Sequence, residues 1–504
     1  MRSDTEIRAT SSSSAPSSFA SGVRSLVEQA LDTARQRGAD YADVRLLETA
    51  REDLQVKNGQ VGSVDRSDSV GLGVRVLVQG GWGYAATGFL TKDAVDACAA
   101  EAVGIARASS GLLQTPVRLA PEPPHRAVWS SPCEVDPFHV PLERKLDLLF
   151  RIDDTLRRVT GVAIAEGFFT FVKKRQLYVS TEGSDIDQTI VRSGGGYSAT
   201  AVSATEVQRR SFPQAEGFHQ TRGYEFIESI PWVENAERVG EEAVALLTAD
   251  PCPQGERDII LEGSQLALQI HESVGHPAEL DRVLGMEANY AGTSFLTTDQ
   301  LRVLRFGSEH VTLMADGTLP GGLATFGYDD EGVEAQRWPI VEDGLFVGYL
   351  TSRELAHTIG ESRSRGCVRA DGWHHVPMIR MVNLSLMPGR GSLDDLLADT
   401  YDGLYLETNR SWSIDQLRYN FQFKTEIAWE IKKGRRVRML RNPTYQGITP
   451  RFWNSCDFVC GPEAWKPWGV TNCGKGQPGQ VAEMTHGAAP ARFRKVNVGV
   501  GYDD

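Results

Sequence analysis

The sequence predicts an α+β fold in which an α/β N-terminal region is followed by a β-rich C-terminal domain. The chain has 504 residues, which suits two or three domains of roughly 150 residues each. Glycine fills 50 positions, above its typical share of roughly 7%, and this excess predicts many turns and bulged strands. Helical and strand-like spacings alternate in the first half, whereas strand-like segments dominate the second half.

Composition argues against several classes of protein. Hydrophobic residues make up 41% and charged residues 24% of the chain, as in a globular protein with ample material for a core. The net charge of −13 argues against general affinity for nucleic-acid phosphates or anionic lipid. No stretch approaches the roughly 20 apolar residues of a membrane helix. We therefore expect no direct nucleic-acid partner and no membrane partner.

The N-terminal segment and the cysteines indicate the cellular compartment of the protein. Residues 1–21 are rich in serine and lack the apolar run of a secretory signal, so we predict a disordered tail. The seven cysteines are an odd, scattered set, unlike the dense pairs of an exported disulfide scaffold. We therefore expect a cytoplasmic protein, in which a functional cysteine is more often a metal ligand or a nucleophile.

Residues 22–110 are predicted to form an N-terminal α/β domain. Apolar residues over 23–34 have the spacing of one helix face. Residues 41–87 alternate or run β-branched, with an Asn-Gly hairpin turn at 58–59. A second helix is predicted over 91–108. Helix, strands and helix make a compact unit.

A proline-rich connector is predicted over 111–137, followed by a middle α/β region over 138–250. Helical spacing recurs over 142–159 and over 232–249, with strand-like sequence between the two. The middle region therefore repeats the plan of the N-terminal domain.

Residues 251–504 are predicted to form the β-rich C-terminal domain. Glu-Asp-Gly at 342–344 and Lys-Gly at 433–434 are typical of hairpin turns between strands. The predicted strands lie within 258–263, 301–306, 339–350, 378–389, 403–409 and 421–431.

One helix of this domain is predicted to bind a metal. The segment from His271 to His276, HESVGH, is similar to the zincin HExxH, in which histidines four residues apart share a helix face and the glutamate is a base. Here the second histidine comes one residue later, about 140° round an unbroken α-helix. Gly275 weakens the helix and Pro277 disfavours helical backbone before it, so His276 is expected just past the helix end or in a π-bulge. The alternative, two ordinary helix histidines, is disfavoured by Glu272 and by this break.

A third ligand has to come from elsewhere, because a catalytic zinc usually has three protein ligands and a water. Cys456, Cys460 and Cys473 have a C-x3-C-x12-C spacing, which lacks the CxxC knuckle and the fourth ligand of a structural zinc site. Cys473 lies in a polar, turn-rich segment where a thiolate can reach a metal. The other two lie among aromatic residues, as buried packing thiols do. The spacing favours Cys473 only modestly.

The motifs together resemble the TldD/PmbA family, specifically its metal-bearing TldD-like subunit, over nearly the whole chain after the serine-rich tail. Single segments are weak signals, but their order and spacing are specific. The sequence departs from the family pattern in its tail and in Cys367 with His374 and His375. The matching segments are 38–45, 71–76, 81–84, 271–276 followed by Glu279, 329–332, 377–383 leading to Pro388-Gly389, and 473–475.

The resemblance implies a zinc-dependent peptidase that processes or degrades unstructured or modified peptides. It implies His271, His276 and Cys473 as ligands of Zn²⁺ and Glu272 as the general base that activates the attacking water. It also implies a dimer, often a heterodimer with a homologous subunit that lacks the metal motif.

Several further residues have more than one interpretation. Glu279 either supports a ligand histidine or fills a coordination position, and a solvated carboxylate is nearly as well supported. Arg380 either anchors the substrate or forms a structural salt bridge. For His374 and His375, an exposed loop is favoured over a second metal site.

Two other functions compete with the peptidase hypothesis. A non-enzymatic binding protein, like a modulator of DNA gyrase, would use HESVGH as a structural metal site. A nucleobase deaminase needs H-x-E and P-C-x-x-C, and the sequence contains neither. For a peptidase, we expect an extended peptide to bind by adding to a sheet edge, which favours unfolded substrates.

Overall fold

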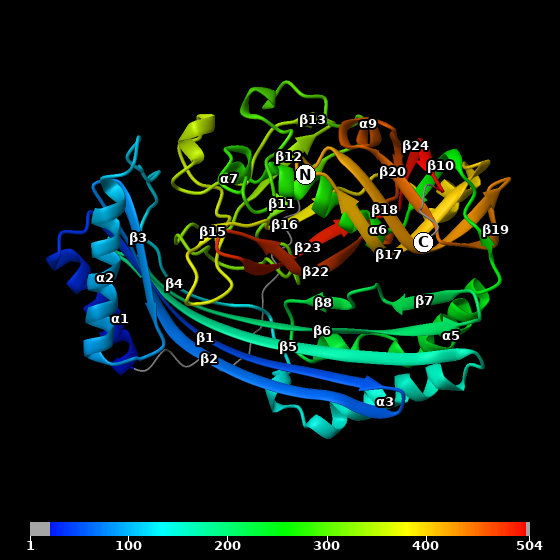
Figure 1. The fold of residues 1–504 in the computed structure, drawn as a ribbon, viewed down its shortest axis with the longest axis horizontal. Helices are drawn as coiled ribbons and strands as arrows, with labels where there is room; N and C mark the ends of the chain where they lie inside the picture. Colours follow the sequence, from blue (N-terminus) through cyan, green and yellow to red (C-terminus); the bar gives the residue numbers. More distant parts are fainter. Residues whose placement is uncertain (1–20, 500–504) are drawn as a thin grey trace, which may run out of the picture.

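The computed structural model describes residues 21–499 and has a mixed α+β structure with a β-rich C-terminal part, which confirms the predicted fold class. Figure 1 shows a long curved sheet from the N-terminal half beneath the C-terminal part. The predicted tail 1–21 lies outside the described residues, except for Ser21, where the first helix begins. Between residues 21 and 499, no helix is long and apolar enough to cross a membrane.

The N-terminal half forms one eight-stranded sheet, in the order β3-β2-β1-β5-β6-β4, with β7 and β8 also paired to β6. The segments 22–110 and 138–250 both contribute to it, because β1 pairs antiparallel with β5 from Asp43 opposite Ser180 to Lys57 opposite Glu166. The strands are β1 (Tyr41–Lys57), β2 (Gln60–Val78), β3 (Gly81–Thr87), β4 (Arg126–Ser130), β5 (Val162–Ser180), β6 (Asp185–Val202), β7 (Val207–Phe212) and β8 (Phe218–Gln220).

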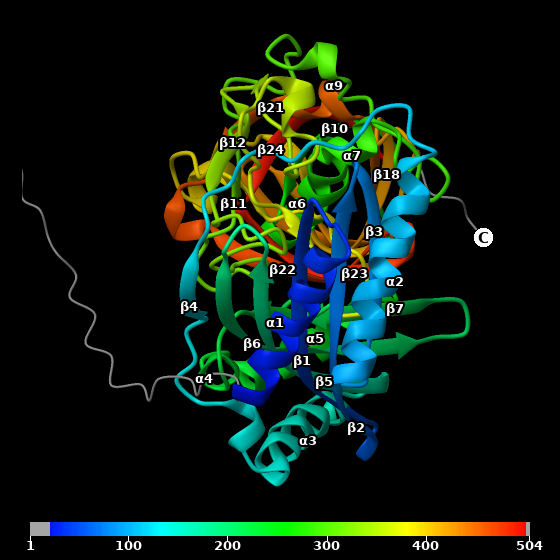
Figure 2. The same cartoon turned by 90° about the vertical axis from the view of Figure 1, so that its left-hand side faces the viewer.

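Alternation along β1 decides what each face of this sheet contacts, because successive side chains of a strand point to opposite faces. Even-numbered residues such as Val44 and Leu54 pack into two apolar clusters with helices. Odd-numbered Arg45 instead bonds Asp330 of the C-terminal part. Figure 2 shows α1 and α2 side by side at one end of the sheet. The helices of this layer are α1 (Ser21–Gln36), α2 (Lys92–Ser110), α3 (Leu142–Arg158), α4 (Glu225–Glu228) and α5 (Trp232–Leu246).

The C-terminal part is built on a second eight-stranded sheet, in the order β17-β10-β24-β20-β18-β19-β9, with β21 paired to β24. A four-stranded sheet (β13-β12-β11-β16) and two hairpins (β14-β15 and β22-β23) complete it. Its strands are β9 (Asp250–Pro251), β10 (Gly255–Leu261), β11 (Leu313–Asp316), β12 (Arg337–Glu342), β13 (Leu345–Phe346), β14 (Val368–Arg369), β15 (Met378–Ile379), β16 (Asn383–Leu386), β17 (Asp402–Ile414), β18 (Asn420–Lys432), β19 (Arg435–Arg441), β20 (Thr444–Ile448), β21 (Cys456–Val459), β22 (Lys466–Lys475), β23 (Gln480–Ala488) and β24 (Ala491–Val498). Its helices are α6 (Gly263–Ile270), α7 (Leu280–Val283), α8 (Leu393–Ala398) and α9 (Thr449–Asn454).

The prediction of a strand over 301–306 is wrong. This segment is a turn in which Arg302 has a positive φ of 61°, so the backbone cannot continue as an extended strand. Only Arg305 forms an isolated bridge there, with Leu345. Apolar residues of this turn still pack into the core, and Phe306 is fully buried.

A buried ion cluster joins the two layers. Arg210 of β7 lies 2.9 Å from Glu242, 3.0 Å from Glu426 and 3.5 Å from Glu407. Glu242 belongs to α5, whereas the other two glutamates lie on β18 and β17 of the C-terminal part. Ser211 also donates to Glu426. One guanidinium therefore holds three carboxylates from both layers.

We predict that Arg210→Met lowers the free energy of unfolding by about 3–5 kcal/mol, because it leaves three partly or fully buried carboxylates without their cation. Urea denaturation followed by circular dichroism measures this loss. Arg209→Met removes the same charge from an exposed neighbour and is expected to change stability by only about 0.5 kcal/mol. Equal effects of the two substitutions would contradict the role of the cluster.

Candidate metal centre

The metal motif lies where a helix changes its winding. Strand β10 leads into α6, and a single π-helical turn, η2 (His271–Gly275), follows directly. The N–H of His276 donates to the carbonyl of His271. This bond spans five residues in one turn, so the two histidines lie one above the other on the same side of the helix. Of the two expected routes, the π-bulge is therefore the one found. A Cβ at position 275 would lie 2.0 Å from the sulfur of Met381, so a larger residue than Gly275 would force the Met381 side chain to move.

His271, His276 and Cys473 come together as three buried candidate ligands. Their ligand atoms all lie within 4.8 Å of one another, and Cys473 Sγ is 3.6 Å from His276 Nε2. Cys473 comes from β22, 197 residues along the chain from His276. Cys456 and Cys460 are buried and, among residues 21–499, belong to no cluster of three possible ligands.

Hydrogen bonds leave the outer nitrogen of each histidine available. His276 Nδ1 lies 3.0 Å from Glu279, a carboxylate that can only accept, so His276 Nδ1 carries the proton. His486 Nδ1 donates to the carbonyl of Leu384 at 2.8 Å, so His486 Nε2 accepts from His271 Nδ1, also at 2.8 Å. Nδ1 is therefore the protonated nitrogen of each neutral ring, and Nε2 is the atom of each candidate ligand that can bind a metal. Two imidazoles and a thiolate fit zinc.

The charge around Cys473 favours its thiolate form. Burial by itself raises the pKa of the Cys473 thiol, but the hydrogen bond and charge of His276 and the charge of Arg380 outweigh it, so the pKa is lowered. Arg380 is buried and does not line the cleft. Its guanidinium donates to the carbonyls of Cys473 and Gln480, and so holds the β22-β23 hairpin in place.

Glu279 contacts both His276 and a buried lysine. Its Oε1 lies 3.2 Å from Lys475 Nζ, which is also 2.8 Å from Asp281. Burial alone raises the pKa of Glu279, but Lys475 and the hydrogen bond from His276 hold it well below its usual range. Of the interpretations of Glu279, the structure shows the contact that supports a ligand histidine.

The three candidate ligand side chains line a cleft of about 230 Å³, together with Glu272 and Arg418. Arg418 lies on the turn between β17 and β18 and forms an ion pair with Glu272. Burial alone raises the pKa of Glu272, but the charges of His276, His271 and Arg418 outweigh this and lower it. The cleft thus holds an ionised carboxylate beside the candidate ligands.

Sequence reasoning missed Arg418 and His486. His486 is fully buried and lies 215 residues after His271, and Arg418 lies 146 residues after Glu272. Neither residue belongs to a spaced motif, so the sequence carried no signal for them.

The structure also brings Asp371, His374 and His375 within 4.8 Å. His374 is exposed, as the favoured interpretation of this loop expected, and His375 Nδ1 is hydrogen-bonded to Asp371. Cys367 is fully buried and does not join the cluster.

Comparisons with known proteins place these features in a family. The chain matches three domain descriptions in order: PmbA/TldA metallopeptidase domain 1 over residues 42–106, the central domain over 135–249 and the C-terminal domain over 254–496. Metalloprotease MJ0996 of Methanocaldococcus jannaschii is 28% identical over 81% of this chain and 87% of its own. The metalloprotease TldD homolog of Haemophilus influenzae is 26% identical over 93% of this chain and 94% of its own.

Solved structures show the same fold. TldE from Thermococcus kodakarensis superposes with a TM-score of 0.72 at 15% identity, over 94% of this chain and 99% of its own. The Thermotoga maritima protein TM0727, described as a candidate modulator of a DNA gyrase, has a TM-score of 0.74 at 17% identity, over 94% of this chain and 100% of its own.

We predict that His486→Ala weakens zinc binding by about 10–100-fold, because His271 loses the partner that fixes its tautomer and ring orientation. Competition with a chromophoric chelator measures this affinity. His310→Ala removes an exposed histidine and is the matched control, expected to leave zinc affinity unchanged. Unchanged affinity in His486→Ala would refute the supporting role.

Proposed function

This chain belongs to the PmbA/TldA metallopeptidase family, and we propose that it is a zinc-dependent peptidase that hydrolyses unstructured or modified peptides, in precursor processing or degradation. The observation that carries the proposal is one shared cleft, lined by His271, His276, Cys473 and Glu272. A structural zinc site has four closed protein ligands, whereas a catalytic one has three and an accessible face. The arrangement therefore favours the peptidase over a binding protein with a structural metal site.

In this proposal the chain's own groups orient the metal and move the proton. Zinc, when bound, supplies a Lewis acid that polarises the scissile carbonyl and acidifies water. Glu272 accepts the proton of the attacking water and delivers it to the leaving amine. Arg418 keeps the Glu272 carboxylate ionised and in place, and Glu279 and His486 hold the ligand histidines.

We propose that the substrate is an extended peptide bound along β22. Within the described part of the chain, β22 pairs as a strand only with β23. Gln214 donates to the carbonyl of Gly469 at 2.8 Å, so a peptide strand would pair with β22 beyond Gly469. Gly469, Val470, Asn472 and Cys473 of β22 line the cleft. Backbone pairing at this edge would place a peptide bond beside the metal with little dependence on side chains.

The proposal also covers the cellular compartment and the oligomeric state. All seven cysteines are free, which supports a reducing cytoplasmic compartment. The family resemblance supports a dimer, either of two copies or with a homologous chain that lacks the metal motif.

We predict that Glu272→Gln abolishes peptide cleavage, with a loss of about 10²–10⁴-fold, while zinc stays bound, because it removes the base and no ligand. Metal analysis and hydrolysis of an unfolded peptide library measure the two properties. Glu309→Gln, an exposed carboxylate, is the matched control. Retained hydrolysis in Glu272→Gln would refute the role of Glu272 as the general base. If the enzyme cut a folded protein as fast as its unfolded form, the proposed preference for unstructured substrates would be refuted.

We predict that Arg418→Met moves the acidic limb of the kcat/KM profile up by about one pH unit. The positive charge of Arg418 lowers the pKa of Glu272, so its removal raises that pKa, and the ionised base is lost at a higher pH as the solution is acidified. Arg435→Met, an exposed cation on β19, is expected to leave the profile unchanged. An unshifted limb in Arg418→Met would show that the ion pair does not act on the base.

A further inference from the structure

A second cavity lies where the β2-β3 hairpin of the first sheet meets the C-terminal part, and its volume is about 300 Å³. Most of its wall is apolar. Trp82, Leu355, Val368, Pro377, Met378 and Ile379 contribute to that wall. Arg75, Asp281, Glu331 and Glu354 are its charged members.

Four sequence motifs that do not line the metal cleft converge on this cavity. The segments 71–76, 81–84, 329–332 and 377–383 each contribute at least one lining residue. None of the four lines the metal cleft. Segments from both layers thus meet around a cavity that peptide hydrolysis does not explain.

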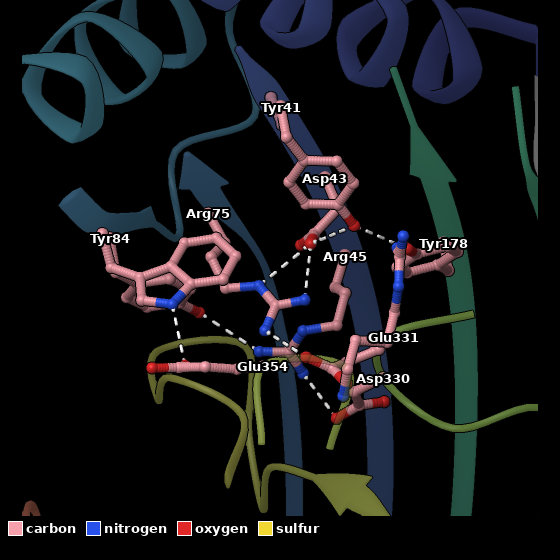
Figure 3. A network of polar contacts seen from close by, with 12 residues as sticks. Tyr41, Asp43, Arg45, Arg75, Tyr84, Tyr178, Asp330, Glu331 and Glu354 are labelled. Atoms are coloured by element: carbon pink, nitrogen blue, oxygen red, sulfur yellow. Dashed lines mark hydrogen bonds and ion pairs between the residues drawn. The ribbon is translucent and has the colours of Figure 1, made fainter. Parts of the chain in front are cut away.

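Most charges near the cavity are already matched. Figure 3 shows Arg75 between Asp43, 2.7 Å away, and Glu331, 3.1 Å away. Arg45 pairs with Asp330 at 3.0 Å in the same network. These pairs are buried, so the arginines of this network are already paired with carboxylates of the network.

Glu354 is the exception. Its carboxylate accepts from the indole N–H of Trp82 at 3.0 Å. In the described part of the chain, no arginine, lysine or histidine lies within ion-pair distance of it. Burial raises the pKa of Glu354, which shows that its charge is poorly compensated. A half-buried carboxylate thus faces an apolar cavity with one neutral donor.

We propose that this cavity binds a small ligand in which a primary ammonium group is carried on an apolar body, with the ammonium donating to Glu354. The apolar wall takes the body of the ligand by hydrophobic burial, and the carboxylate supplies the charge-assisted hydrogen bond that selects the ammonium. An anionic ligand is disfavoured because Glu331 and Asp281 face the same space. The volume suits a small molecule in a site between two layers.

The cavity is separate from the metal cleft but connected to it. Asp281 lines the cavity and pairs with Lys475, which pairs with Glu279, the hydrogen-bond partner of His276. Among residues 21–499, none lines both the cavity and the cleft. A ligand in the cavity therefore binds without contact to the candidate metal ligands.

Calorimetric titration of the full chain, stripped of metal with EDTA, tests the proposal. The probes are 2-phenylethylammonium, the neutral isostere 2-phenylethanol and the anion 3-phenylpropionate. We expect the ammonium to bind about tenfold more tightly than the alcohol, as one hydrogen bond to a charged group predicts, and the anion to bind least tightly. Equal affinities for ammonium and alcohol, or no binding of any probe, would overturn the proposal.

Three variants locate the binding. Glu354→Gln is expected to abolish the preference for the ammonium and to keep the affinity for the alcohol, which also reports that the cavity is folded. Glu309→Gln makes the same change at an exposed site and is expected to keep the preference. Cys473→Ser is expected to keep it too, because the metal centre takes no part. A preference that survives in Glu354→Gln, or is lost in Cys473→Ser, would place the ammonium elsewhere.

Discussion

One backbone hydrogen bond, from the N–H of His276 to the carbonyl of His271, makes the metal centre possible. On an unbroken α-helix the two side chains would diverge by about 140° and could not share an ion. The π-turn brings them back to one side, and glycine at position 275 leaves room for the Met381 side chain that packs against this turn. The irregular winding of a short helical segment therefore decides whether His271 and His276 can share a metal.

Buried hydrogen bonds around the ligands keep that geometry in a usable state. Glu279 and His486 accept hydrogen bonds from Nδ1 of His276 and of His271, so that Nε2 of each neutral ring is the atom that can bind a metal. Lys475 in turn holds Glu279, with Asp281 as its second partner. Each group is buried, so its partners and not water set its protonation and orientation.

The two layers are joined by charge as well as by apolar packing. One face of the first sheet packs on helices through apolar side chains, and the other presents charged residues such as Arg45 and Arg75 to the C-terminal part. Near the other end of the strands, Arg210 also joins the two layers through ion pairs. Charged pairs have specific geometry, so they fix how the layers sit and thereby shape the cavity beside Glu354.

The sequence alone determined the local structure. Helical spacing predicted α1, α2, α3 and α5, Asn-Gly predicted a hairpin, and the Gly and Pro residues around His276 predicted the broken helix. Tertiary structure decided the rest. It joined both α/β segments into one sheet and turned 301–306 into a loop. It also placed Cys473, and not Cys456 or Cys460, beside the two histidines, and brought His486 and Arg418 next to them. The reason is physical: spacing reports neighbours within a few residues. The contacts that join the sheet and build the candidate metal centre link residues about 110 to 215 apart, which only packing of the whole chain brings together.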